Sequence, residues 1–198
     1  MSFADLLAEV RACRHCEQSL PHAPRPVLQA GVSARLAIIG QAPGARVHQS
    51  GRPFTDPSGD RLRDWMGVGP DVFYDPNRLA IIPMGFCFPG YDAKGADLPP
   101  RKECAPLWHE RLFRHLPNLS CILLVGGYAH RRYLPKPEKG PRLNVTEAAR
   151  AWRSAPAPFF PLPHPSWRNN HWLKTNPWFE AEALPVLRKR VTAAIVQP

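Results

Sequence analysis

The sequence has no apolar run long enough to cross a membrane, because a spanning helix needs about 20 consecutive apolar residues. It also lacks both glycine patterns that bind nucleotide phosphates: "GQAPG" at 40–44 does not fit G-x-G-x-x-G, and no Gly-Lys-Ser/Thr follows it. Acidic residues are scarce, with 16 Asp and Glu against 26 Lys and Arg, so the formal net charge is +10. These features disfavour a membrane protein and a nucleotide-cofactor enzyme. A basic surface suits a polyanionic partner such as nucleic acid, although a generally basic protein without such a partner is the simpler alternative.

The amino-terminal stretch "MSFADLLAEVRACRHC" is amphipathic and contains acidic residues, unlike a secretory signal peptide. We therefore expect a soluble, cytoplasmic protein with no membrane partner. A chain of 198 residues that is 44% hydrophobic can form one domain with its own core. No repeat or low-complexity linker divides it, so we expect a single domain over residues 1–198. The sequence carries no signal for the oligomeric state, and a monomer is the default expectation.

Four short apolar runs are each bounded by turn residues, which is typical of strands buried on both faces of a parallel sheet. They lie at 35–40, 78–86, 120–127 and 157–164. Helical patterns lie at 58–68, 101–116, 127–134, 144–153 and 176–196, with a serine cap predicted at Ser58 and a break or kink near Pro185. The alternation of strands and helices predicts an α/β protein. Its architecture would be a three-layer α/β/α sandwich around a central four-stranded, mainly parallel sheet.

Two predicted strand ends carry residues suited to a binding site, and ligands bind at the carboxyl ends of strands in open α/β sheets. The first strand ends at the loop 40–44, whose glycines let the backbone approach a ligand closely, and Phe54 and Asp56 follow it. The fourth strand ends at His164, within "PLPHPSWRNNHWLK" at 161–174. Its basic, amide and aromatic side chains suit phosphate contacts and base stacking.

Four of the five cysteines form a pattern compatible with a metal centre. Cys13 and Cys16 form "CRHC", and Cys87 and Cys104 bracket a proline-rich segment. In a cytoplasmic protein such thiols bind metal more readily than they form disulfides. Zinc and iron–sulfur clusters both accept four thiolates, and free thiols are the remaining alternative. Cys121 lies inside an apolar run and is predicted to be a core residue.

Six motifs in this order, "CRHC", "GQAPG", "GRPF", the spaced pair Cys87 and Cys104, "ILLVGG" and "HPS", resemble the uracil-DNA glycosylase superfamily, specifically its iron–sulfur branches, families 4 and 5. The resemblance covers nearly the whole chain. It implies a DNA glycosylase that acts on uracil-containing DNA and flips uracil out of the helix, with other deaminated bases as further candidate substrates. It also implies that Cys13, Cys16, Cys87 and Cys104 bind a 4Fe-4S cluster in preference to zinc.

The resemblance further implies a role for each motif residue. The backbone at "GQA" would lie against the flipped base, and an aromatic ring would stack on it. The histidine of "HPS" would donate to a uracil carbonyl oxygen and stabilise the anionic leaving base. A carboxylate would complete the hydrolysis. The implied catalytic residues are Asp56 and His164, and the implied substrate-binding residues are Gly40, Gln41, Ala42, Phe54, Ser166, Arg168 and Asn169.

The sequence departs from family 4 at two places. Family 4 has acidic residues just after the glycine loop, where this chain has "ARVH" at 45–48, and an asparagine at the end of the second strand, where this chain has Pro83. Family 5 lacks the first acid too and uses an aspartate in the region of Asp56. Asp60 and His48 are alternatives to Asp56, and the backbone of Met84 or Gly85 is a candidate to compensate for Pro83.

Two further functions stay open on the sequence. One is a DNA- or lesion-binding protein on the same fold that has lost catalysis, which the missing acid and amide would allow. The other is a zinc-stapled RNA-binding protein, which the positive charge and the "CRHC" motif alone would permit.

Overall fold

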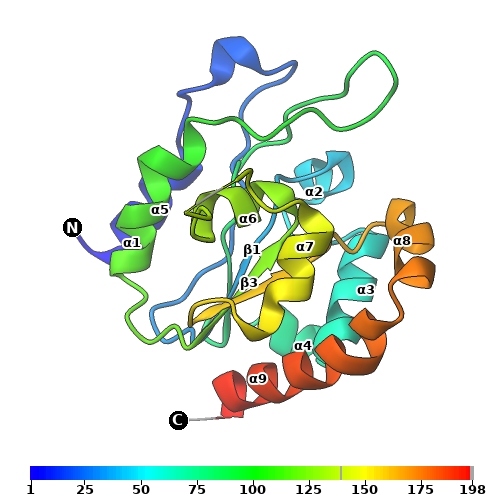
Figure 1. Ribbon diagram of the computed structural model, residues 1–198. Helices are drawn as coiled ribbons and strands as arrows, with labels where there is room; N and C mark the ends of the chain where they lie inside the picture. Colours follow the sequence, from blue (N-terminus) through cyan, green and yellow to red (C-terminus); the bar gives the residue numbers. More distant parts are fainter. Residues whose placement is uncertain (139, 197–198) are drawn as a thin grey trace.

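The computed structural model describes residues 1–138 and 140–196, and its centre is a sheet of four parallel strands (Figure 1). The strands are β1 (Leu36–Ile39), β2 (Leu79–Ile81), β3 (Cys121–Val125) and β4 (Phe159–Leu162), and they lie side by side in the order β2-β1-β3-β4. β1 pairs in parallel with β2 and β3, and β3 pairs in parallel with β4. The predicted α/β architecture is confirmed, and its sheet is wholly parallel.

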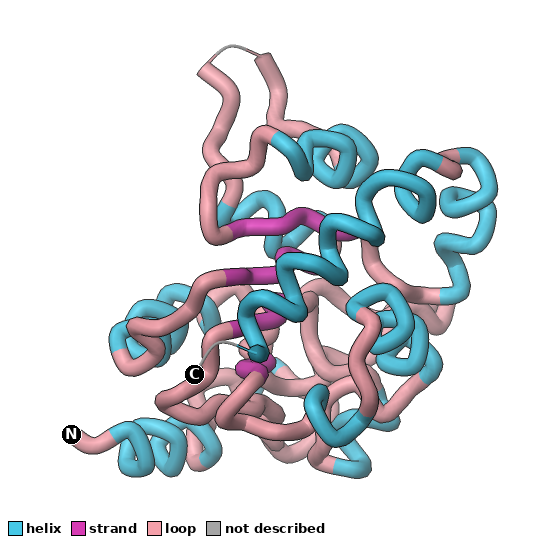
Figure 2. Tube along the Cα trace, turned by 90° about the horizontal axis from the view of Figure 1, so that it is seen from below, coloured by secondary structure: helices cyan, strands magenta, loops and turns pink. Residues whose placement is uncertain are grey.

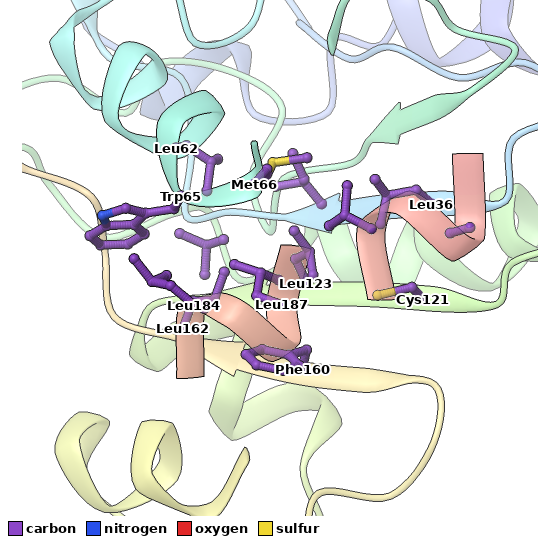
Figure 3. Close-up of a cluster of buried hydrophobic side chains, with 14 of the residues drawn as sticks. Leu36, Leu62, Trp65, Met66, Cys121, Leu123, Phe160, Leu162, Leu184 and Leu187 are labelled. Atoms are coloured by element: carbon purple, nitrogen blue, oxygen red, sulfur yellow. The ribbon is translucent and has the colours of Figure 1, made fainter. Parts of the chain in front are cut away.

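Side chains alternate between the two faces of the sheet, so each strand contributes to two separate cores. In β1, Leu36 and Ile38 belong to one core, while Ala37 and Ile39 belong to the other. The first core is covered by α3 (Pro57–Met66), α4 (Pro70–Phe73) and α9 (Leu184–Val196), and the second by α1 (Phe3–Arg11), α5 (Cys104–Arg114) and α6 (Gly127–Tyr133). Figure 2 shows α9 crossing the face of the sheet. Figure 3 shows side chains of α3 and α9, among them Trp65 and Leu187, packed against those of the strands.

The helical patterns are confirmed with shifted ends. The predicted segments correspond to α3, α5, α6, α7 (Val145–Arg150) and a carboxyl-terminal pair, in which a π-helical turn, η4 (Phe179–Ala183), leads directly into α9 just before Pro185. Short elements were not predicted: α2 (Ala45–Ser50), α4, α8 (Asn170–Thr175) and the 3-10 turns η1 (Glu17–Ser19) and η3 (Trp167–Asn169). The 3-10 turn η2 (Ala151–Arg153) continues α7 within the predicted segment 144–153. In the part of the chain that the structure describes, no helix is both long and apolar enough for a membrane span.

The predicted serine cap at Ser58 is wrong, because α3 is capped two residues earlier, by Asp56. The Asp56 side chain accepts the Gly59 N–H at 3.2 Å, and Pro57 occupies the first helical position. Aspartate is among the strongest N-cap residues, proline is favoured at the first helical position, and a carboxylate is stabilised at the positive end of a helix. The cap therefore fixes the place of Asp56.

The first turn of α3 lies so close to Phe54 that only glycine fits at position 59. A Cβ on Gly59 would lie 1.9 Å from the Phe54 carbonyl oxygen. We expect Gly59→Ala to lower the free energy of unfolding by about 2–3 kcal/mol, because the backbone must shift to relieve the clash. Thermal unfolding followed by circular dichroism measures the effect. Gly44→Ala is the control, since no atom lies within 4 Å of the place of its Cβ. Equal stability of the two variants would contradict the close packing.

Candidate active site

The carboxyl ends of β1, β2 and β4 meet at one edge of the sheet and open onto a cavity of about 610 Å³. β1 leads into the loop 40–44, β2 leads to Pro83, and β4 leads to His164, and all three contribute to the cavity wall. Ligand pockets typically measure about 300–1,000 Å³. The predicted residues that line the cavity are Gly40, Gln41, Ala42, Phe54, Asp56, His164, Ser166 and Arg168.

Asn169 is the predicted substrate-binding residue that does not line this cavity. Its side-chain amide donates to the His164 carbonyl oxygen at 2.7 Å. Asn169 therefore fixes the backbone that carries the histidine.

Phe54 forms one wall of the cavity in a strained backbone conformation. Its φ is 52°, and no other non-glycine residue in 1–138 or 140–196 has a positive φ. Its carbonyl oxygen accepts a hydrogen bond from the Tyr74 hydroxyl at 3.0 Å, and its ring packs edge-on against Phe73 at 5.9 Å between centroids. Strain held by several neighbours is typical of functional sites. The ring reaches Gly40, where an added Cβ would lie 3.5 Å from the Phe54 Cζ atom.

His164 lies at the carboxyl end of β4, beside the neighbouring strand end. Gly126, just after β3, faces it at ordinary contact distance, since a Cβ there would lie 3.8 Å from the His164 Cβ. Burial lowers the pKa of His164, and the charge of Asp56 opposes that effect without reversing it. The imidazole is therefore neutral at neutral pH and can donate one N–H into the cavity without carrying a positive charge.

The loop after His164 is attached to α3 by Arg61. The Arg61 guanidinium donates to the Ser166 carbonyl at 3.0 Å and to the Asn170 side-chain oxygen at 2.8 Å. The Ser166 hydroxyl accepts the Arg168 N–H at 3.3 Å and so begins η3. In this frame Trp167 lines the cavity and is nevertheless 68% exposed. An exposed aromatic ring at the rim can contact a ligand that enters from solvent.

Neither alternative to Asp56 lines the cavity. Asp60 is exposed and forms an ion pair with Arg63 at 2.5 Å. The His48 ring lies 4.0 Å from the His22 ring, measured between centroids, and burial together with the charges of His22 and Arg25 lowers the pKa of His48. Both side chains are thus engaged elsewhere.

The end of β2 offers no free N–H in place of the missing asparagine. Proline has no N–H, and the next two N–H groups are bonded within the chain: Met84 donates to the Gly40 carbonyl at 2.9 Å, and Gly85 to the Gln41 carbonyl at 3.0 Å. The N–H groups of Met84 and Gly85 are therefore not free to replace an amide donor at position 83. The two bonds instead tie the end of β2 to the glycine loop.

A family model of the uracil DNA glycosylase superfamily matches residues 29–188, which include all four strands and, apart from Val27, the cavity wall. The chain belongs to the uracil DNA glycosylase superfamily. Membership places it among the DNA glycosylases, the hydrolases of base excision repair, which act on DNA.

In this uracil DNA glycosylase superfamily member, four cysteines lie outside the cavity and interact electrostatically with one another. They are Cys13, Cys16, Cys87 and Cys104. Burial is the main cause that raises the pKa of Cys87 to about 11, and the charges of Cys13 and Cys16 add to it. Burial likewise raises the pKa of Cys104 to about 12, with contributions from the other three thiols. The fold therefore brings together thiols from three separate segments. Cys121 is buried in β3, as predicted.

The side chains of these four cysteines do not form a preassembled metal site in the structure. Within the described residues, no three His, Cys, Asp or Glu side chains are arranged so that they could hold a metal ion. This arrangement does not distinguish zinc from an iron–sulfur cluster, and both stay predictions. Backbone N–H groups of Arg25 and Phe86 bond to the sulfurs of Cys87 and Cys104, a contact that also stabilises and tunes thiolate ligands.

Arg46, Tyr91 and Asp97 are residues of the cavity wall that the sequence motifs did not indicate. Tyr91 and Asp97 pair in an isolated antiparallel bridge between Cys87 and Cys104. Asp97 is one of two aspartates in a loop rich in glycine and proline, which gives no periodic signal. Asp97 reaches the cavity only because the loop between Cys87 and Cys104 folds back toward the strand ends.

Proposed function

We propose that the protein is a monofunctional uracil-DNA glycosylase, which flips uracil out of DNA into the cavity and hydrolyses the N-glycosidic bond. The observation that carries the proposal is the meeting of Phe54, Asp56 and His164 at one cavity in a member of this superfamily. Excision of a flipped base requires an aromatic face for stacking, a donor for the developing anion and a carboxylate near the sugar.

Binding would begin with the phosphates and end with the base. The positive charge of the protein and the guanidinium groups of Arg46 and Arg168 at the cavity favour contacts with the DNA backbone. The flipped base would stack on the face of the Phe54 ring and lie beside the glycine loop, because the edge of the ring already lies close to Gly40. Trp167, exposed at the rim, would fill the gap left in the base stack. These contacts offset the cost of unstacking, which is a few kcal/mol.

The chemical step would leave negative charge on the base and positive charge on the sugar. As the C1′–N bond breaks, the electron pair stays on uracil, and His164 donates its N–H to the carbonyl oxygen that becomes negative. A neutral imidazole suits this task, and the lowered pKa of His164 keeps it neutral. Asp56, fixed by its cap of α3, would face the oxocarbenium-like sugar and stabilise its positive charge.

We also propose that Cys13, Cys16, Cys87 and Cys104 hold a 4Fe-4S cluster. Their mutual effect on pKa and the N–H groups at two of the sulfurs support this assignment. The bound cluster would supply iron–thiolate bonds that cross-link three chain segments. The residues between Cys87 and Cys104, which include the wall residues Tyr91 and Asp97, would thereby be held at both ends.

A second candidate function is binding of damaged DNA without catalysis. The observation that favours it is the end of β2, where Pro83 lacks an N–H and its carbonyl accepts the Nε2–H of buried His109 at 3.0 Å. A site that reads uracil with fewer hydrogen bonds can still bind a flipped base by stacking.

Base release from a single-stranded oligonucleotide with one uracil, detected as alkali-labile cleavage, tests the proposed function. Wild-type protein should release uracil, and His164→Ala should be slower by about 10²-fold, because a positioned donor to a developing anion contributes about 3 kcal/mol. His171→Ala is the matched control, since His171 is an exposed residue nearby that does not line the cavity. Binding of uracil-containing DNA without release by folded wild type would favour the second function.

A further inference from the structure

The segment between Cys87 and Cys104 brings a second carboxylate to the cavity. Asp97 lines the same cavity as Asp56, His164 and Arg168. It belongs to a short hairpin, within the green loop above α2 in Figure 1, that is closed by the Leu98 N–H donating to the Gly90 carbonyl at 2.9 Å. The cavity wall is thus completed by a loop that follows β2 in the sequence and folds back over the strand ends.

The hairpin is well defined by its own hydrogen bonds. Asp92 accepts the N–H groups of Lys94 at 2.8 Å and Ala96 at 2.9 Å through one carboxylate oxygen, and its N–H donates to the Ala96 carbonyl at 2.8 Å. At its base, a Cβ on Gly90 would lie 2.8 Å from Pro21, so the hairpin also packs on the amino-terminal segment. These contacts fix the position of Asp97.

The environment of Asp97 makes it a stronger base than an ordinary carboxylate. Although much of the residue is exposed, burial of its carboxyl group raises the pKa of Asp97; the charge of Arg168 lowers it and that of Asp56 raises it. Asp97 therefore lies within electrostatic reach of both residues. Enzymes that hydrolyse glycosides commonly divide their work between two carboxylates in different environments, one of which handles a proton.

We propose that Asp97 is a second catalytic carboxylate, which holds the attacking water and accepts its proton. The inference rests on the proposed glycosylase function. The water oxygen bonds to C1′ as the C1′–N bond breaks, and the electron pair of that bond leaves with the base, which accepts a hydrogen bond from His164. One water proton moves to Asp97 and the other stays on the new sugar hydroxyl. Asp97 then releases its proton to solvent, and the departed anionic base takes up one proton from solvent.

Asp97→Asn and Asp92→Asn form a matched pair that tests this role. Both remove one negative charge from the same hairpin, but Asp92 does not line the cavity, and an asparagine oxygen can still accept the two N–H groups of the turn. Single-turnover uracil release should fall by at least about ten-fold in Asp97→Asn, because positioned proton acceptors contribute factors of this size or more. Asp92→Asn should keep the wild-type rate, and neither variant should bind uracil-containing DNA more weakly than wild type.

Added formate distinguishes a chemical role of the Asp97 carboxylate from a structural one. In Asp97→Ala, sodium formate should restore part of the lost rate, because a small carboxylate can enter the space of the missing side chain, whereas it should leave wild type unchanged. A wild-type rate in Asp97→Asn, or a defect in Asp97→Ala that does not respond to formate, would overturn the role of Asp97 alone. Absence of uracil release by the folded wild type would overturn the proposed function and this inference with it.

Discussion

Asp56→Asn should lower the rate of uracil release by about 10³-fold, within the range found for positioned catalytic groups, while leaving the fold intact. The Asp56 side chain accepts the Gly59 N–H as the cap of α3. Asparagine caps helices about as well as aspartate, so the substitution removes the charge at the cavity and keeps the cap. Single-turnover release and the thermal unfolding midpoint, measured on the same preparation, separate the two effects. Asp56→Ala would remove charge and cap together and could not separate them.

Asp60→Asn is the control for Asp56→Asn. Asp60 lies on the same helix and is exposed, and although its partner Arg63 is largely buried, an asparagine oxygen at position 60 can still accept the Arg63 N–H. Its release rate should stay close to that of wild type. If Asp56→Asn released uracil at the wild-type rate, the charge of Asp56 would not be needed for catalysis. Asp97 would then be the remaining candidate for the catalytic carboxylate.

The strands and the place of the cavity were predictable from the sequence because both follow from a short-range rule. A strand in the middle of a parallel sheet must be apolar on both faces, and Leu36 and Ala37 show why: adjacent residues of β1 enter opposite cores. Once the strands are parallel, their carboxyl ends must lie at one edge. Gly40 and His164, 124 positions apart in the sequence, are therefore brought to one cavity.

The features that were missed depend on contacts between distant segments. Asp56 and Ser58 are both acceptable caps, and the choice of Asp56 places Gly59 against Phe54, a packing contact that no local pattern encodes. The N–H groups of Met84 and Gly85 were possible base contacts until the structure showed them bonded to the glycine loop. Asp97 lines the cavity only because its loop folds back toward the strand ends, and hydrogen bonds to Asp92 stabilise the turn of that loop.

The largest loss of stability is expected from removing one cysteine of the proposed cluster. The wild-type protein should be brown, with broad visible absorbance and about four iron atoms per chain. Cys104→Ser should lose the colour and the iron, and it should unfold at a lower temperature, because the free energy of binding a structural metal centre counts as folding free energy. Burial raises the pKa of Cys104 to about 12, so without bound iron the thiol stays protonated at neutral pH.

Cys121→Ala is the control for Cys104→Ser, because Cys121 is a buried cysteine of β3 that does not belong to the group of four. It should keep the colour and the iron while losing some packing energy. The comparison distinguishes loss of a ligand from loss of any buried sulfur. A colourless wild type with one zinc per chain would contradict the cluster, and full iron content in Cys104→Ser would remove Cys104 from the ligand set. Because Cys87 and Cys104 hold the two ends of the segment that carries Asp97, loss of the cluster should also slow uracil release in any protein that remains folded.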